Sequence, residues 1–229
     1  MALLLYDLAG ADERRRFSPY CWRIHLALKH KGLPFETRPW RFTEKEALAR
    51  SGGTTVPVLV DGERWTSDSW QIAEALDAQY ADRPALFDGA AGWQHARLTK
   101  HWVEGALFPL LLRMLAQDIH DRIHEKDKAY FRASREKRFG MTLEAYVAER
   151  DQAREQFRQT LTPLRRLLAE QPFVCGKAPA FADYIAFGAL QWARCVSPYP
   201  VLAEDDAVVP WRERMLDLYG GYARSFPAG

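Results

Sequence analysis

The sequence predicts an α/β domain in residues 1–81, a linker in residues 82–92 and an all-helical domain in residues 93–229. In the first domain, short apolar runs alternate with helical patterns in the order β-α-β-α-β-β-α. Beyond the linker no segment has a convincing strand pattern, and long amphipathic stretches follow one another. A short stretch rich in proline and glycine separates the two patterns, as is typical of a linker.

The first strand and the first helix have clear signals. Residues 3–7, Leu-Leu-Leu-Tyr-Asp, have the apolar composition of a buried strand. A helical pattern then covers residues 18–31. Pro19 stands at its first position, where a missing backbone N–H is tolerated, and Gly32 follows its last residue. These start and stop signals predict a helix directly after Ser18.

A second strand and a short helix are predicted next. Residues 35–39 fit a strand, and residues 43–50 fit a short helix. Thr43 stands at the start of this helix, and Glu46 follows at the spacing of a capping box. We therefore expect Thr43 to cap the helix.

A β-hairpin and a third helix complete the α/β domain. Residues 56–60 are a β-branched run, Asp61-Gly62 is a hairpin turn signal, and residues 64–66 form the return strand. Asp68 then opens a helix. The apolar residues that share one face of this helix are Ile72, Ala75, Leu76 and Tyr80.

The helical domain begins with a long, interrupted pattern. Residues 93–121 have helical periodicity but contain Gly105 and Pro109. Because proline lacks an N–H and clashes with the preceding turn, we expect a kink at residues 105–108.

Three further helices are predicted in this domain. Residues 143–169 form a long amphipathic pattern, and residues 208–218 form a terminal helix. Residues 181–195 are apolar nearly all round, which indicates a central buried helix. The stretch 127–140 is crowded with Arg and Lys, and no element is assigned to it.

Charge and cysteine content exclude several classes of partner. Lys and Arg number 32 against 30 Asp and Glu, a formal net charge of +2, so no strongly basic field indicates nucleic acid or an anionic membrane. Residues 1–8 lack a signal-peptide pattern, and no apolar run has membrane-spanning length. The three cysteines are far apart and odd in number, which argues against a disulfide framework. We expect a cytoplasmic protein.

The start of the first helix is the first candidate site. Ser18 places a small hydroxyl at the N-cap, beside unpaired N–H groups and a partial positive charge that favour an anion. A thiolate held there would have a lowered pKa, because the dipole and a hydroxyl hydrogen bond both favour its charged form. Ser18 alone could equally be an ordinary helix cap.

Two further pieces strengthen this interpretation. Val56-Pro57 precedes a strand, and a cis bond there would expose the Val56 backbone to a ligand. Asp68-Ser69 opens another helix, where a carboxylate and a hydroxyl could hold the ends of an amino acid. Each piece is weak alone, but their order and spacing together are specific.

In this order and spacing, the three pieces resemble the cytosolic glutathione transferases. Residues 179–183, Pro-Ala-Phe-Ala-Asp, also resemble the family's capping motif of a buried helix. Ala180 takes the place of the usual Ser or Thr cap, so Asp183 is expected to hold that turn alone. The resemblance implies a thioredoxin-like N-terminal domain, an all-helical bundle domain and a homodimer.

The resemblance implies a role for each piece. Ser18 matches the catalytic serine, which stabilises the thiolate of glutathione, the co-substrate. Val56, before the presumed cis Pro57, matches the residue whose backbone pairs with the cysteinyl part. Asp68-Ser69 matches the pair that binds the γ-glutamyl end. The thiolate would attack a small-molecule aromatic electrophile, and no metal is implied.

Other site residues are predicted around these. Arg41 and Lys45 are candidates for the glycyl carboxylate of glutathione, with Arg41 favoured for its bidentate geometry. Trp102, Phe108 and Arg113 surround the expected kink, where the family's second-substrate wall lies. For the two aromatic side chains, core packing is an equally good interpretation.

The subclass rests on short motifs. Residues 18–23, Ser-Pro-Tyr-Cys-Trp-Arg, and residues 68–70, Asp-Ser-Trp, look closest to the bacterial lignin β-etherases and the related fungal FuA class. That likeness implies cleavage of a β-aryl ether. The alternatives are a zeta-like glutathione-dependent isomerase, a non-catalytic glutathione-fold binding protein and a glutathione-dependent oxidoreductase. The sequence does not identify the electrophile.

Two other motifs are open to a second interpretation. Cys21, one helical turn after Ser18, is either a small buried hydrophobe or the remnant of a redox pair. His120 and His124 have the spacing of a zinc-binding helix, but no third ligand is evident. A solvated helix end is the interpretation we prefer for them.

Overall fold

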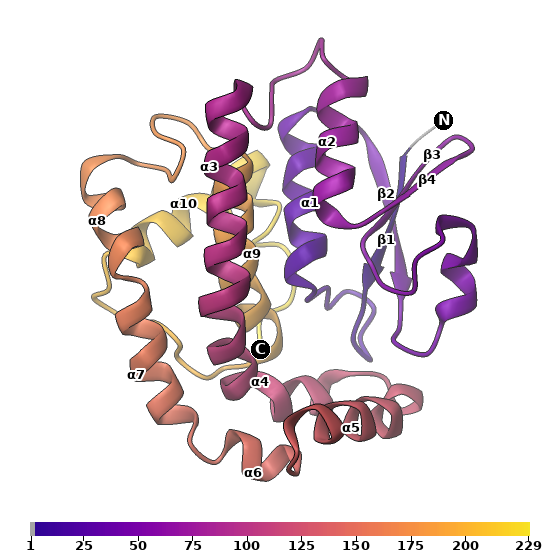
Figure 1. The fold of residues 1–229 in the computed structure, drawn as a ribbon, viewed down its shortest axis with the longest axis vertical. Coiled ribbons are helices and arrows are strands. Elements are labelled where there is room, and N and C mark those ends of the chain that lie inside the picture. The colour runs from indigo at the N-terminus through magenta and orange to yellow at the C-terminus, as the bar shows by residue number, and fades with distance from the viewer. Residues whose placement is uncertain (1–2) are drawn as a thin grey trace.

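A computed structural model describes residues 3–229. A four-stranded sheet with the strand order β2-β1-β3-β4 forms the centre of the α/β domain (Figure 1). Strands β1 and β2 are parallel, whereas β1–β3 and β3–β4 are antiparallel. The elements are, in order, β1 (Leu3–Leu8), α1 (Pro19–His30), β2 (Phe35–Trp40), the 3₁₀ helix η1 (Lys45–Ser51), β3 (Val58–Asp61), β4 (Arg64–Ser67) and α2 (Ser69–Gln79). This order confirms the predicted thioredoxin-like domain.

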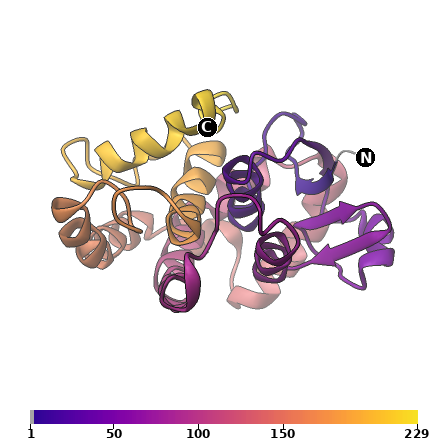
Figure 2. The same ribbon diagram turned by 90° about the horizontal axis from the view of Figure 1, so that it is seen from above.

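The regular elements in the rest of the described chain are helices. They are α3 (Gly89–Trp102), the π-helical segment η2 (Val103–Leu107), α4 (Phe108–Arg122), α5 (Glu125–Phe139), α6 (Leu143–Val147), α7 (Arg150–Thr160), α8 (Thr162–Glu170), α9 (Phe181–Val196) and α10 (Val208–Gly221). Figure 2 shows the sheet on one side of the molecule, α1 and α2 in the middle and most of the helical domain on the other side, with a pink part of the helical domain behind the sheet. Helix α1 packs directly against α9, which joins the two domains through buried side chains.

The local signals of α1 act as predicted. Ser18 is the N-cap, Pro19 is the first helical residue, and Gly32 follows with a φ of 63°. Asp61 and Arg64 pair across the hairpin, and Gly62 in its turn has a φ of 59°. A positive φ costs glycine little, which is why this turn signal could be recognised.

The predicted kink is a π-helical turn. The N–H of Phe108 donates to the carbonyl of Val103, five residues back, instead of four. Pro109 cannot donate a backbone hydrogen bond, and the wider turn accommodates that loss. The one long, interrupted helix that the sequence predicts is thus divided in the structure into α3, η2 and α4.

Three sequence predictions are wrong in detail. The helix of residues 43–50 is a 3₁₀ helix that begins at Lys45, and Thr43 does not cap it. The Thr43 hydroxyl instead donates to Asp127 Oδ1 at 2.7 Å, so a long-range partner replaces the local one. Residues 143–169 form three helices rather than one, and the basic stretch 127–140 lies almost entirely in α5. On α2, Ala73 rather than Ala75 belongs to the buried face.

Helix α9 is the buried centre of the helical domain, as predicted. The Asp183 carboxylate holds its first turn, accepting from the Ala180 N–H at 3.2 Å. It also accepts from the Val174 N–H at 2.7 Å, the Cys175 N–H at 3.0 Å and Trp211 Nε1 at 3.0 Å. One buried carboxylate therefore replaces the missing cap of Ala180. Within residues 3–229, no helix is long and apolar enough to cross a membrane.

Candidate active site

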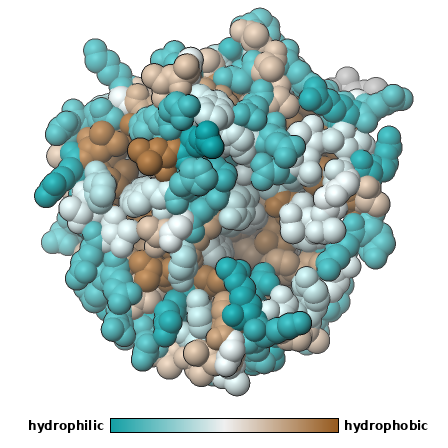
Figure 3. Space-filling view, viewed as in Figure 1, coloured by the Kyte–Doolittle hydropathy of each residue, from teal (hydrophilic) through white to brown (hydrophobic). Residues whose placement is uncertain are grey.

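A cavity of about 730 Å³ lies where the two domains meet. The α/β domain contributes the start of α1, residues 53–57 and residues 67–69. The helical domain contributes side chains from α3, η2, α4, α5 and α9. Figure 3 shows a hollow near the centre of this face, with hydrophobic residues at its floor. The volume is within the range of small-molecule sites.

Ser18 lies at the wall of this cavity with only 4% of its surface exposed. Its Oγ accepts from the Cys21 N–H at 3.2 Å, which caps α1. Among residues 3–229 the hydroxyl donates to no acceptor, so its proton is free for a ligand in the cavity. The first turn of α1 holds no acidic side chain that would neutralise the helix dipole. An anion beside Ser18 would therefore receive both a hydrogen bond and a favourable field.

The start of α2 forms a second polar corner of the same cavity. Asp68 is its N-cap, with Oδ1 accepting from the N–H groups of Trp70 at 2.9 Å and Gln71 at 3.1 Å. Its φ of 72° lies in a region that non-glycine residues rarely adopt and that is often found at ligand sites. Ser69 is 2% exposed, and its hydroxyl bonds to no other group in the described chain. Val56 and Pro57, joined by a cis bond as predicted, line the wall between these corners.

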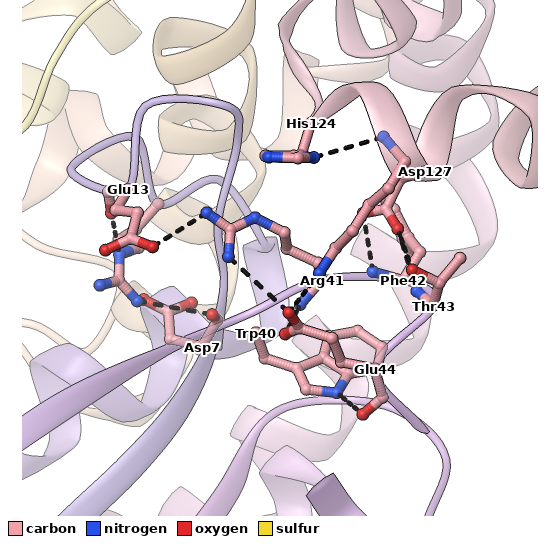
Figure 4. A network of polar contacts seen from close by, with 11 residues as sticks. Asp7, Glu13, Trp40, Arg41, Phe42, Thr43, Glu44, His124 and Asp127 are labelled. Atoms are coloured by element: carbon pink, nitrogen blue, oxygen red, sulfur yellow. Dashed lines mark hydrogen bonds and ion pairs between the residues drawn. The ribbon is translucent and has the colours of Figure 1, made fainter. Parts of the chain in front are cut away.

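Arg41 is not among the residues that line the cavity. Its guanidinium pairs with Glu13 at 2.9 Å and lies 3.8 Å from Glu44 (Figure 4). These two carboxylates hold the Arg41 side chain outside the cavity lining. Lys45 does line the cavity and pairs with no carboxylate in the described residues. Its Nζ lies 5.0 Å from the ring centroid of Tyr130.

Of the predicted second-substrate residues, only Phe108 lines the cavity. Its ring meets Tyr20 edge-on at 5.4 Å and Trp192 at 5.6 Å between centroids. Trp102 packs against the hydrophobic core instead. Arg113 pairs with Glu149 at 2.9 Å and is not among the residues that line the cavity.

Helix α5 supplies site residues that the sequence reasoning missed. Phe131, Arg135 and Arg138 line the cavity, and their spacing of i, i+4 and i+7 places them on one helical face. Tyr130 lines the cavity as well. The spacing was the available signal, but the abundance of Arg and Lys concealed the amphipathic pattern.

Asp127 ties α5 to the α/β domain. Its buried carboxylate accepts from the N–H groups of Phe42 and Thr43, both at 3.0 Å, in addition to the Thr43 hydroxyl (Figure 4). The Phe42 ring then lies 5.6 Å from that of Phe131. This contact between domains closes one side of the cavity and brings Lys45 opposite α5.

The nearby tyrosine and cysteine are held neutral. Burial, followed by the negative charge of Glu104, raises the pKa of Tyr20. Burial also raises the pKa of the Cys21 thiol well above its ordinary value, and the residue is fully buried. Cys21 is therefore a packed side chain in this structure, without the thiolate character that redox exchange needs.

His120 and His124 do not form a ligand cluster. His120 lies 3.4 Å from Asp121, and His124 accepts from the Lys126 N–H at 3.3 Å. No group of three or more His, Cys, Asp or Glu side chains in residues 3–229 is placed to hold a metal ion.

Comparison with known proteins gives matches along nearly the whole chain. Residues 17–79 match the family model "Glutathione S-transferase, N-terminal domain", and residues 95–211 match "Glutathione S-transferase, C-terminal domain". The glutathione transferase GSTFuA2 from Phanerochaete chrysosporium is similar at 25% identity and a TM-score of 0.78, covering 99% of this chain and 95% of that one. A glutathione S-transferase of Ceriporiopsis subvermispora, in complex with glutathione, is similar at 22% identity and a TM-score of 0.77, covering 98% and 94%.

Proposed function

This chain belongs to the glutathione S-transferase family, and from that premise we propose that its cavity holds glutathione with the sulfur beside Ser18. An electrophile then binds against the wall of Phe108, Tyr20 and Trp192. Asp68 and Ser69 hold the γ-glutamyl end, and the Val56 backbone pairs with the cysteinyl part. The γ-glutamyl and cysteinyl parts of the tripeptide would thus both lie on the α/β domain.

The observation that carries this proposal is the hydrogen bonding of Ser18. Its oxygen already caps α1 at 3.2 Å from the Cys21 nitrogen, while its proton has no acceptor among residues 3–229. The hydroxyl is thus fixed in place and still able to donate to a thiolate. Lowering a thiol pKa from about 8.5 by ~2 needs ~2.7 kcal/mol. One charge-assisted hydrogen bond, at roughly 1.5–3 kcal/mol, together with the helix dipole can supply that.

The reaction we favour is cleavage of an aryl ether. The thiolate sulfur forms a bond to the carbon that carries the ether oxygen, and the C–O bond breaks. The electron pair leaves with the phenolate, which takes a proton from water. The motif of residues 18–23, which resembles that of the lignin β-etherases, supports this subtype.

The purified chain tests the function directly. We expect it to conjugate glutathione to 1-chloro-2,4-dinitrobenzene faster than the uncatalysed reaction, and to release one phenol and one thioether from a β-aryl ether ketone. Glutathione recovered unchanged beside an isomerised product would indicate an isomerase. Tight glutathione binding without turnover of any electrophile would indicate a non-catalytic binding protein.

Lys45 and Arg41 are the two candidates for binding the glycyl carboxylate, and matched variants of them can be compared. We expect Lys45→Gln to weaken glutathione binding about three- to tenfold, since it removes a cation at the cavity that has no carboxylate partner among residues 3–229. Arg41→Gln should leave the Kd within about twofold, because its charge is already taken by Glu13 and Glu44. Isothermal calorimetry on both variants decides between them, and a loss confined to Arg41→Gln would reverse the assignment.

Two broader expectations accompany this function. We propose a homodimer built on α2 and α3, where Leu98 of α3 is a large hydrophobic side chain with 70% exposure. We also propose a cytoplasmic location, which the three unpaired cysteines support.

A further inference from the structure

The α5 side of the cavity carries positive charge that no carboxylate in residues 3–229 neutralises. Lys45, Lys100, Arg135 and Arg138 are the cations of the lining. Lys100 is paired with Glu104 at 3.1 Å. Within residues 3–229, the other three have no carboxylate within ion-pair distance.

Not every arginine of α5 lacks an acidic partner, as a comparison of Arg132 with Arg135 shows. Arg132, also on α5, pairs with Glu136 and Glu144, both at 2.9 Å. In the described part of the chain, Arg135 forms a side-chain hydrogen bond only with the Ser134 hydroxyl, at 3.0 Å. Its guanidinium lies 4.7 Å from the ring centroid of Phe131 and 5.8 Å from that of Phe42. Two aromatic faces thus hold a planar cation that has donors to spare.

The two arginines also repel each other. Burial lowers the pKa of the Arg135 guanidinium, and the positive charge of Arg138 lowers it further. An anion bound beside both side chains would relieve this repulsion and offset the desolvation. The acidic residues of the lining do not serve this purpose. Glu104 is committed to Arg23 at 2.8 Å and to Lys100, while Asp68 caps α2.

We infer that the second substrate is an aromatic electrophile carrying an anionic group, such as a carboxylate, which Arg135 and Arg138 bind. This inference rests on the proposed function, in which Asp68, Ser69 and Lys45 account for the two ends of glutathione. The aromatic part would then lie among the rings of the cavity, with its anionic group toward α5. Arg135 and Arg138 determine specificity rather than activate the thiol.

Calorimetry with an unreactive pair of probes tests this inference. The chain is saturated with S-methylglutathione, which cannot react, and titrated with 3,5-dinitrobenzoate or with neutral 3,5-dinitrobenzamide. We expect the benzoate to bind about tenfold more tightly than the amide, since a charge-assisted bond in a partly buried site is of this size. Arg138→Gln should reduce the preference, and the Arg135→Gln/Arg138→Gln double variant should abolish it.

Lys137→Gln is the matched control, because it removes the same charge from the exposed side of α5. It should keep the preference for the benzoate. Equal binding of the two probes to the wild type, or a preference that survives in the double variant, would overturn the inference. So would a loss of S-methylglutathione affinity in the double variant, since the cations would then serve the tripeptide.

The same titrations without S-methylglutathione keep the two proposals apart. Failure of S-methylglutathione to bind would contradict the proposed function alone, provided that the benzoate preference and its loss in the double variant persist. Arg138 is exposed, so the single variant at that position is expected to fold even if a change at Arg135 disturbs α5.

Discussion

Replacing Ser18 with alanine is expected to lower turnover near neutral pH by about 10- to 100-fold, because the bound thiol loses about 1.4–2.7 kcal/mol of thiolate stabilisation. Glutathione affinity should stay nearly unchanged, since in the proposed arrangement the sulfur is the only atom of glutathione that the Ser18 hydroxyl contacts. The activity should recover in part as the pH rises, because the thiolate then forms without help. Steady-state rates between pH 6 and 9 measure both effects.

Loss of the helix cap needs a separate control. Thr142 caps α6 as Ser18 caps α1, with Oγ1 accepting from the Ala145 N–H at 3.2 Å. Thr142→Ala removes an equivalent cap outside the cavity and should leave the pH profile unchanged. Ser18→Cys should lose transferase activity and gain disulfide exchange through a helix-terminal thiol. Wild-type rates in Ser18→Ala would show that Ser18 only caps α1. Tyr20, whose neutral hydroxyl lies nearby, would then be the next candidate for activating the thiol.

Replacing Ser69 with alanine is expected to weaken glutathione binding by about 1–3 kcal/mol, roughly 5- to 150-fold in Kd. The Ser69 hydroxyl is nearly buried and has no partner among residues 3–229, so a charged end of the ligand would lose its donor. The pKa of the bound thiol should not move. Calorimetry gives the affinity. Ser69→Ala is thus expected to change the affinity but not the thiol pKa, whereas Ser18→Ala should change the thiol pKa but not the affinity.

Asp68→Asn complements this variant. Asparagine keeps the N-cap of α2 but removes the charge, so only the attraction to the ligand's ammonium group is lost. We expect a smaller but measurable weakening. Unchanged glutathione affinity in both variants would remove the γ-glutamyl end from this corner of the cavity.

Local signals explain which parts of the fold were predictable. Ser18, Pro19 and Gly32 mark α1 through residues that lie next to it in sequence. The same holds for the Asp61-Gly62 turn and for the buried helix α9. The η1 helix was misassigned because Thr43 bonds to Asp127, a partner 84 residues away in sequence.

In the candidate site, too, the residues marked by local signals were predictable and those placed by distant partners were not. Ser18, Val56, Pro57, Asp68 and Ser69 all line one cavity, because each stands at an element boundary that the sequence marks. Arg41 was favoured for its side-chain chemistry, but the position of a long side chain depends on its partners, and Glu13 and Glu44 hold this one elsewhere. The contribution of α5 depends on the contact of Asp127 with the α/β domain, which no local pattern reveals.

Ultraviolet titration of bound glutathione tests the central claim most directly, because the thiolate absorbs near 240 nm and the thiol does not. For the wild type we expect a bound-thiol pKa about 2 below the ordinary value of about 8.5. In Ser18→Ala this pKa should rise by about 1–2, while the Thr142→Ala control should match the wild type. An identical thiol pKa in the wild type and in Ser18→Ala would contradict the role of Ser18 in forming the thiolate.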